Sequence, residues 1–221
     1  MTGETLREIY ELLFERFGRQ HWWPGETRFE IMVGAILTQN TNWGNVEKAI
    51  GNLKGANLLT PEGLHGVDIS ELAALIRPAG YYNVKAKRLK NFIEWLFEAY
   101  GGELGALDGI GTARLREELL GVKGIGRETA DSILLYALGR GIFVVDAYTA
   151  RVAIRHGLIE PEADYEQLRE LFQSNLPQEV GLFNEYHALL VRVGKEFCRP
   201  TARCGGCPLE KLPHSVDSGY F

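Results

Sequence analysis

The sequence is poor in cysteine and methionine, and it contains no long apolar run. Three cysteines and two methionines occur among 221 residues. No stretch of about 18 apolar residues is present, which argues against a transmembrane helix. The first residues lack a basic segment followed by an apolar one, so no secretory signal is expected. We therefore expect a cytoplasmic protein with no membrane partner.

An excess of positive charge is also missing. The chain has 24 Lys and Arg against 29 Asp and Glu, for a net charge of −5. Proteins that bind nucleic acids usually carry a basic surface, so this net charge argues against an extended basic surface for nucleic-acid binding. It leaves room for a local site, because backbone amides at a helix N-terminus attract phosphate without basic side chains.

Strand patterns are scarce as well. The apolar run Ile142–Val145 is short and isolated, whereas residues such as Phe29, Val33 and Ile36 recur at helical spacing. This periodicity predicts an all-α protein. The C-terminal third of the chain is expected to form helices over 147–156, 164–175 and 179–196.

A glycine-rich turn is the first motif with a functional interpretation. Gly124 and Gly126 flank Ile125, and Thr129 follows in a predicted helix. Two helices joined by such a turn expose backbone amides that can hold a DNA phosphate, with or without a bound monovalent cation. The residues expected to contact DNA here are Lys123, Gly124, Ile125, Gly126, Arg127 and Thr129.

Asp146 stands where the next helix starts. An aspartate before Ala147 is a good N-cap, because its carboxylate accepts hydrogen bonds from the first helical amides. The alternative is chemistry: a carboxylate close to the turn could face the sugar of an extruded nucleotide. The two roles are compatible.

Tryptophans and amides form further candidates. Trp22 and Trp23 precede a Pro-Gly pair, and they are either core anchors or rings that stack on a base. Gln39 lies in a polar stretch that ends at Trp43. That stretch either satisfies a helix end or forms a wedge that fills the gap left by an extruded nucleotide, with Trp43 as a stacking ring.

The basic run from Lys85 to Lys90 has two interpretations. A charge run on a helix is usually a solvated face. The alternative is a patch that contacts phosphates.

These motifs together resemble a known family. Leu120–Ala130 with Val144–Asp146 is similar to the helix-hairpin-helix, Gly/Pro-rich loop and aspartate (HhH-GPD) superfamily of DNA glycosylases, in its endonuclease III group. The segments that most resemble the third-type 3-methyladenine DNA glycosylases are Ala35–Thr41, Arg77–Ala86 and Gly124–Asp131, and Trp22–Pro24 fits that subgroup too.

The resemblance implies two helical lobes with a DNA-binding cleft between them. A six-helix lobe with the hairpin would span 25–140. The second lobe would combine 1–24 with 141–221. The implied partner is double-stranded DNA that contains a damaged base, bound by a monomer near the nucleoid.

The resemblance also implies a mechanism. Bifunctional members carry a lysine two residues after the second hairpin glycine, where this chain has Glu128. A carboxylate cannot form a Schiff base, so we expect a monofunctional glycosylase without lyase activity. Asp146 would stabilise the sugar cation and orient or deprotonate water. Glu128 either shapes the pocket or is a first-turn acid favoured by the helix dipole.

The expected substrate is an alkylated purine such as 3-methyladenine, because a cationic base stacks well on the indoles of Trp22, Trp23 and Trp43. The alternatives are a uracil or thymine-mismatch glycosylase, a bifunctional endonuclease III-type glycosylase, and a non-catalytic DNA-binding module.

All three cysteines cluster near the C-terminus. Cys198, Cys204 and Cys207 follow the pattern Cys-x5-Cys-x2-Cys, which favours a metal site over three buried thiols. The segment resembles the iron–sulfur loop of endonuclease III-like glycosylases, which has four cysteines and a first gap of six residues. Pro213 takes the fourth position, and His214 beside it is a candidate ligand. A [4Fe-4S] cluster, a zinc site and an empty loop remain open.

Overall fold

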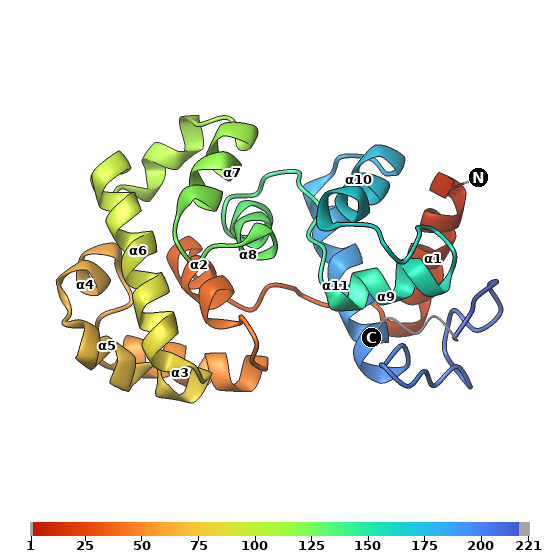
Figure 1. The fold of residues 1–221 in the computed structure, drawn as a ribbon, viewed down its shortest axis with the longest axis horizontal. Coiled ribbons are helices and arrows are strands. Elements are labelled where there is room, and N and C mark those ends of the chain that lie inside the picture. Colours follow the sequence, from red (N-terminus) through yellow and green to blue (C-terminus); the bar gives the residue numbers. More distant parts are fainter. Residues whose placement is uncertain (1, 217–221) are drawn as a thin grey trace. The chain divides into compact units, whose positions relative to one another are not determined.

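The computed structural model describes residues 2–216, and the described residues form helices and no strand. This confirms the predicted all-α class. The chain divides into two compact units (Figure 1). The terminal unit comprises the chain up to Trp23 together with the chain from Gly141 onward, and the middle unit spans Pro24–Arg140. None of the described helices has the length and apolar character needed to cross a membrane.

The middle unit is organised around α2 (Arg28–Leu37), which packs against α3, α6 and α8. Met32 and Val33 of this helix are fully buried. The segment holds seven α-helices rather than the six expected, because Val67 and Asp68 separate α4 from α5. The other helices are α3 (Trp43–Gly55), α4 (Pro61–Gly66), α5 (Ile69–Leu75), α6 (Tyr82–Tyr100), α7 (Thr112–Gly121) and α8 (Arg127–Ser132), with 3₁₀ turns at Arg77–Ala79 and Leu104–Gly109 and a π-helical extension of α8 at Ile133–Ala137.

Two lysines of the basic run on α6 are used inside the middle unit. Lys85 is buried, and its Nζ donates to the carbonyl oxygens of Leu37 at 2.9 Å and Ala79 at 2.7 Å. Lys90 Nζ donates to the carbonyl of His65 at 2.9 Å. Cations are favourable beside carbonyls at helix ends, which otherwise lack partners. Neither a solvated face nor a phosphate patch describes Lys85, so both interpretations were wrong for this residue.

The terminal unit contains α1 (Thr2–Phe17), α9 (Ala147–Arg155), α10 (Tyr165–Asn175) and α11 (Val180–Glu196). The last three lie within a residue of the predicted ranges. Phe143 stacks on Phe172 with ring centroids 4.2 Å apart, and Phe183 and Tyr186 of α11 complete this aromatic core. The buried hydroxyl of Tyr186 donates to the carbonyl of Leu6 at 2.7 Å. The N-terminal helix is therefore built into the same core as the C-terminal helices.

Candidate functional site

The predicted hairpin is present in the middle unit, where the turn Val122–Gly126 joins α7 to α8. Gly124 has φ +101°, and a Cβ on it would lie 2.4 Å from Cγ of Arg88. Gly126 has φ −95°, and a Cβ there would meet nothing within 4 Å. The amide of Ile125 donates to the carbonyl of Val122 at 3.0 Å and closes the turn. Backbone and packing thus require glycine at 124 and tolerate a side chain at 126.

The predicted DNA-contacting side chains of the hairpin fall into two groups. Lys123 and Arg127 are exposed, so their charges can reach a phosphate in solution. Ile125 and Thr129 are buried. These two can therefore act on DNA only through the backbone they position.

Gln39 lies on the hairpin itself. Its Nε2 donates to the carbonyl of Gly124 at 3.1 Å and to Oγ1 of Thr129 at 2.9 Å, and its Oε1 accepts from Arg88. Asn91 adds a further brace from α6, because its Nδ2 donates to the carbonyl of Lys123 at 2.8 Å. The Nε2 end of the Gln39 amide therefore holds the turn while its Oε1 end is tied to α6, a role that the sequence did not suggest.

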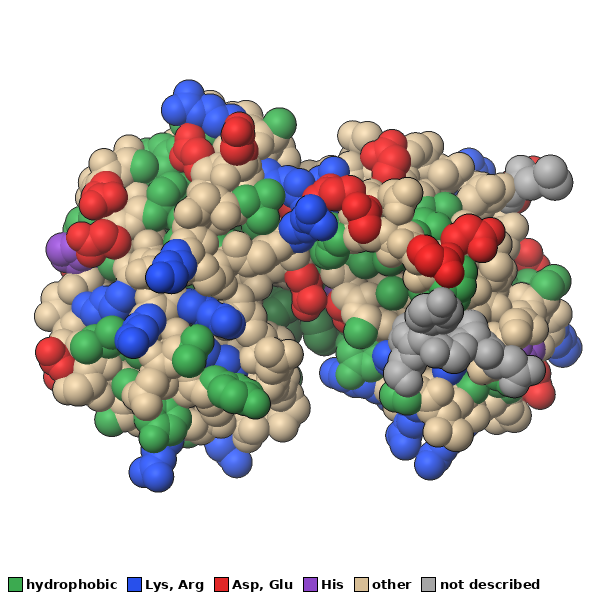
Figure 2. Space-filling model, viewed as in Figure 1, with side chains coloured by type: hydrophobic (Ala, Val, Ile, Leu, Met, Phe, Trp, Pro, Cys, Tyr) green, Lys and Arg blue, Asp and Glu red, His purple; other side chains and the backbone are tan. Residues whose placement is uncertain are grey.

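Tyr81 is an exposed aromatic residue that the sequence reasoning missed. It precedes α6 with φ +44°, and 72% of the residue is accessible to solvent. An exposed ring can stack on a nucleic-acid base. Figure 2 shows Lys and Arg side chains gathered over the same unit. The aromatic pair Tyr81-Tyr82 after Gly80 was the available signal.

Asp146 is the N-cap of α9 in the terminal unit. Its Oδ1 accepts from the amide of Thr149 at 2.8 Å and from Oγ1 of Thr149 at 3.0 Å. Its Oδ2 lies 3.9 Å from Nε2 of His187, and 13% of the side chain is exposed. The capping role is confirmed. Both capping hydrogen bonds go to Oδ1, and Oδ2 takes part in neither of them.

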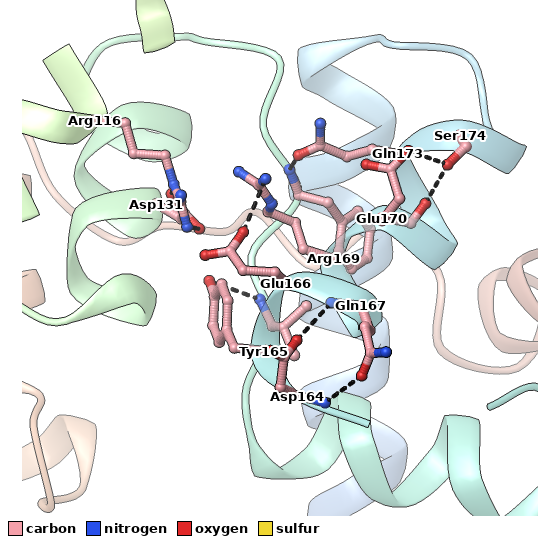
Figure 3. Close-up of polar contacts among 12 residues, drawn as sticks. Arg116, Asp131, Asp164, Tyr165, Glu166, Gln167, Arg169, Glu170, Gln173 and Ser174 are labelled. Carbon is pink, nitrogen blue, oxygen red and sulfur yellow. Dashed lines mark hydrogen bonds and ion pairs between the residues drawn. The ribbon is translucent and has the colours of Figure 1, made fainter. Parts of the chain in front are cut away.

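The segment before Asp146 is held by α10 and α11. The amide of Phe143 donates to Oε1 of Gln173 at 2.9 Å, and the amide of Val145 lies 3.5 Å from the hydroxyl of Tyr165 (Figure 3). The carbonyl of Val144 accepts from Nδ1 of His187 at 2.9 Å. These contacts set the position from which the carboxylate projects.

His187 also connects Asp146 with the tryptophans. The ring of Trp22 lies 6.4 Å from the ring of His187 and 5.5 Å from the ring of Trp23. Nε1 of Trp22 is buried without a hydrogen-bond partner among the described residues. The structure therefore places Trp22 and Asp146 on either side of a histidine that the sequence reasoning missed, with Trp23 next to Trp22. Its only signal was a single polar residue on the apolar face of a helix.

Two other predicted pocket residues belong to the middle unit. Trp43 is the first residue of α3 and is half-buried. Glu128 is exposed in the first turn of α8. An acidic side chain in a first turn is favoured by the helix dipole, in line with the simpler interpretation of Glu128.

The three cysteines line one pocket of the terminal unit together with His156 and His214. Nη1 of Arg155 donates to Sγ of Cys198 at 3.2 Å. Burial raises the pKa of the Cys207 thiol. Within residues 2–216, however, no three His, Cys, Asp or Glu side chains are grouped closely enough to hold a metal ion. The donor types suit a metal, but their arrangement does not enclose one.

The sequence is similar to that of known DNA repair proteins. The model of the HhH-GPD superfamily of base excision DNA repair proteins matches residues 33–178. A protein of Methanocaldococcus jannaschii assigned by name to the DNA repair glycosylases is 51% identical over 211 residues, which cover 95% of this chain and 96% of the relative. Endonuclease III of Thermotoga maritima is 30% identical over 203 residues, covering 90% and 85%.

A solved structure is similar in fold as well as in sequence. The 3-methyladenine DNA glycosylase of H. pylori, determined with bound 1,N6-ethenoadenine, superposes with a TM-score of 0.75 at 30% identity. The match covers 88% of this chain and 97% of that protein.

Proposed function

Because the chain belongs to the HhH-GPD superfamily of base excision DNA repair proteins and is a DNA glycosylase, we propose that it removes an alkylated purine such as 3-methyladenine from double-stranded DNA by hydrolysis alone. The observation that carries the proposal is the capping carboxylate of Asp146, which lies beside His187, whose ring is in turn next to Trp22 and, through it, Trp23. The similarity to the H. pylori enzyme supports the choice of base.

Asp146 is the proposed catalytic residue. With Oδ1 used as the helix cap, Oδ2 is the oxygen available to the reacting sugar. A carboxylate held in place before the reaction stabilises the positive charge that develops at C1′ as the glycosidic bond breaks. A rigid cap is therefore compatible with catalysis, because it removes the need to reorient the side chain.

The absence of an amine at position 128 supports hydrolysis without strand cleavage. A Schiff base needs a nucleophilic amine, and Glu128 offers a carboxylate. An alkylated purine carries a positive charge, stacks favourably on indole and leaves easily. The proposed substrate thus matches a site with two tryptophans and one carboxylate.

The hairpin is the proposed phosphate grip. Its turn is braced by Gln39 and Arg88, so its backbone is already in place when DNA arrives. Phosphate contacts position a protein on DNA but carry no sequence information. We therefore assign selectivity to the tryptophans and orientation to the hairpin, in a monomer bound to one duplex.

The cysteine loop takes no part in the proposed reaction. The proposed reaction uses Asp146 and water, and among residues 2–216 the cysteines and nearby histidines are not grouped closely enough to hold a metal ion. Iron, sulfide and zinc analysis of the purified protein decides among a [4Fe-4S] cluster, a zinc site and a metal-free loop.

A panel of lesion-bearing duplexes tests the proposal. We expect release of 3-methyladenine by the wild type, strand breaks only after alkali treatment, and loss of release with retained binding in Asp146→Asn. Release of uracil or mismatched thymine in place of alkylated purines would favour the mismatch alternative. A covalent adduct with DNA that borohydride traps would show that the protein is a bifunctional glycosylase with lyase activity. Binding without base release from any duplex would favour the non-catalytic DNA-binding module.

A further inference from the structure

We propose that His187 is a second catalytic residue: together with Asp146 it binds the water that attacks the sugar and accepts a proton from that water. The inference rests on the proposed glycosylase function and names the group that activates its nucleophile.

The hydrogen bond of His187 to the backbone defines which ring nitrogen carries the proton. Nδ1 lies 2.9 Å from the carbonyl oxygen of Val144. A carbonyl oxygen only accepts, so Nδ1 is the donor, and Nε2 of the neutral ring carries a lone pair. This lone pair is on the nitrogen nearest Asp146.

The distance between Nε2 and the carboxylate suits a shared water. Nε2 and Oδ2 of Asp146 are 3.9 Å apart, which is too long for a direct hydrogen bond. Both atoms are acceptors when the imidazole is neutral. Two hydrogen bonds of about 2.8 Å that leave one water oxygen at an angle of about 105° reach acceptors about 4.4 Å apart, and a modest bend of either bond fits the observed 3.9 Å. One water can therefore donate a hydrogen to each atom while its lone pairs face the substrate.

Burial and one short backbone segment position this pair. Only 6% of the His187 side chain and 13% of the Asp146 side chain are exposed. Val144, which binds Nδ1, stands two residues before Asp146, so one short segment sets the position of both groups. The hydrogen bond to Val144 explains the position of Nδ1. Nε2 faces the Asp146 carboxylate, which is the orientation that a general base sharing a water with Asp146 needs.

The reaction balances with these groups. The bond between C1′ and the base nitrogen breaks, and its electron pair leaves with the base. A lone pair of the water oxygen forms the new bond to C1′. The water proton passes to Nε2, and the resulting imidazolium is stabilised by the neighbouring Asp146 carboxylate until the proton passes to solvent.

A pair of variants separates this role from a structural one. In His187→Asn the amide nitrogen can take the place of Nδ1 and keep the bond to Val144, while the group at Nε2 is lost. In His187→Gln the amide reaches the place of Nε2 instead. We expect single-turnover base release per folded molecule to fall about 100-fold in His187→Asn, in the range of general-base effects, with unchanged duplex affinity. His187→Gln should retain more activity per folded molecule.

Product partition in mixtures of water and methanol gives a second measurement. Methanol can donate only one hydrogen bond, so wild type should favour water over methanol at C1′. Loss of one acceptor in His187→Asn should raise the share of methyl glycoside. Normal release by His187→Asn, or slow release with an unchanged methanol share, overturns the inference alone. A wild type that releases no base from any duplex overturns the proposed function and this inference with it.

Discussion

Replacing Gly124 with alanine should destabilise the hairpin turn, whereas the same change at Gly126 should be tolerated. Alanine at 124 must adopt a positive φ, which costs an L-residue about 1–2 kcal/mol. Its Cβ would also lie 2.4 Å from Cγ of Arg88, so that side chain has to move. A displaced Arg88 loses its hydrogen bond to Gln39, worth about 1.5–3 kcal/mol for a charged donor.

Together these effects predict a loss of about 2.5–5 kcal/mol in the free energy of unfolding of Gly124→Ala, and a fall in melting temperature on the order of 10 °C. Circular dichroism melts measure the stability, and fluorescence anisotropy with a labelled duplex measures the affinity, which should fall as well. Gly126→Ala is the matched control, since φ −95° suits alanine and a Cβ meets no neighbour. Equal melting temperatures for the two variants would refute the reasoning.

Three further changes test the structural basis of the two units. Arg116→Ala removes the bidentate partner of the buried Asp131 carboxylate (Figure 3) and should cost about 3–5 kcal/mol in urea unfolding; a loss below about 1 kcal/mol would contradict this. Burial, with a smaller effect from Arg88, lowers the pKa of Lys85 to about 8. The unfolded chain then binds more protons between pH 8 and 10, so this lysine makes stability rise with pH, and Lys85→Met should remove that rise. If the free energy of unfolding changes with pH in the same way in wild type and Lys85→Met, the lowered pKa of Lys85 is contradicted. Asp146→Ala should lose about 1 kcal/mol of stability that Asp146→Asn keeps, because asparagine retains the cap oxygen; identical thermal melts would show that the cap contributes little.

The parts of the site that could be predicted depend on short stretches of chain. The hairpin and the cap at Asp146 are defined by residue types within a few positions of one another. The helices over 147–156, 164–175 and 179–196 followed from apolar spacing, and the structure reproduces them within a residue. Lys85 shows where such reasoning fails: a lysine beside other basic residues indicates a charged surface, yet it is buried against two helix-end carbonyls.

The sequence by itself determined the helical class, the glycine turn and the carboxylate at a helix start, because local spacing encodes all three. Only the tertiary structure decided which of the two glycines is sterically required, that Gln39 braces a turn 85 positions away, and that His187 binds a carbonyl 43 positions before it. The physical reason is that these contacts join elements far apart in the chain. A residue's neighbours along the sequence show what it can do, but packing selects the atoms it meets.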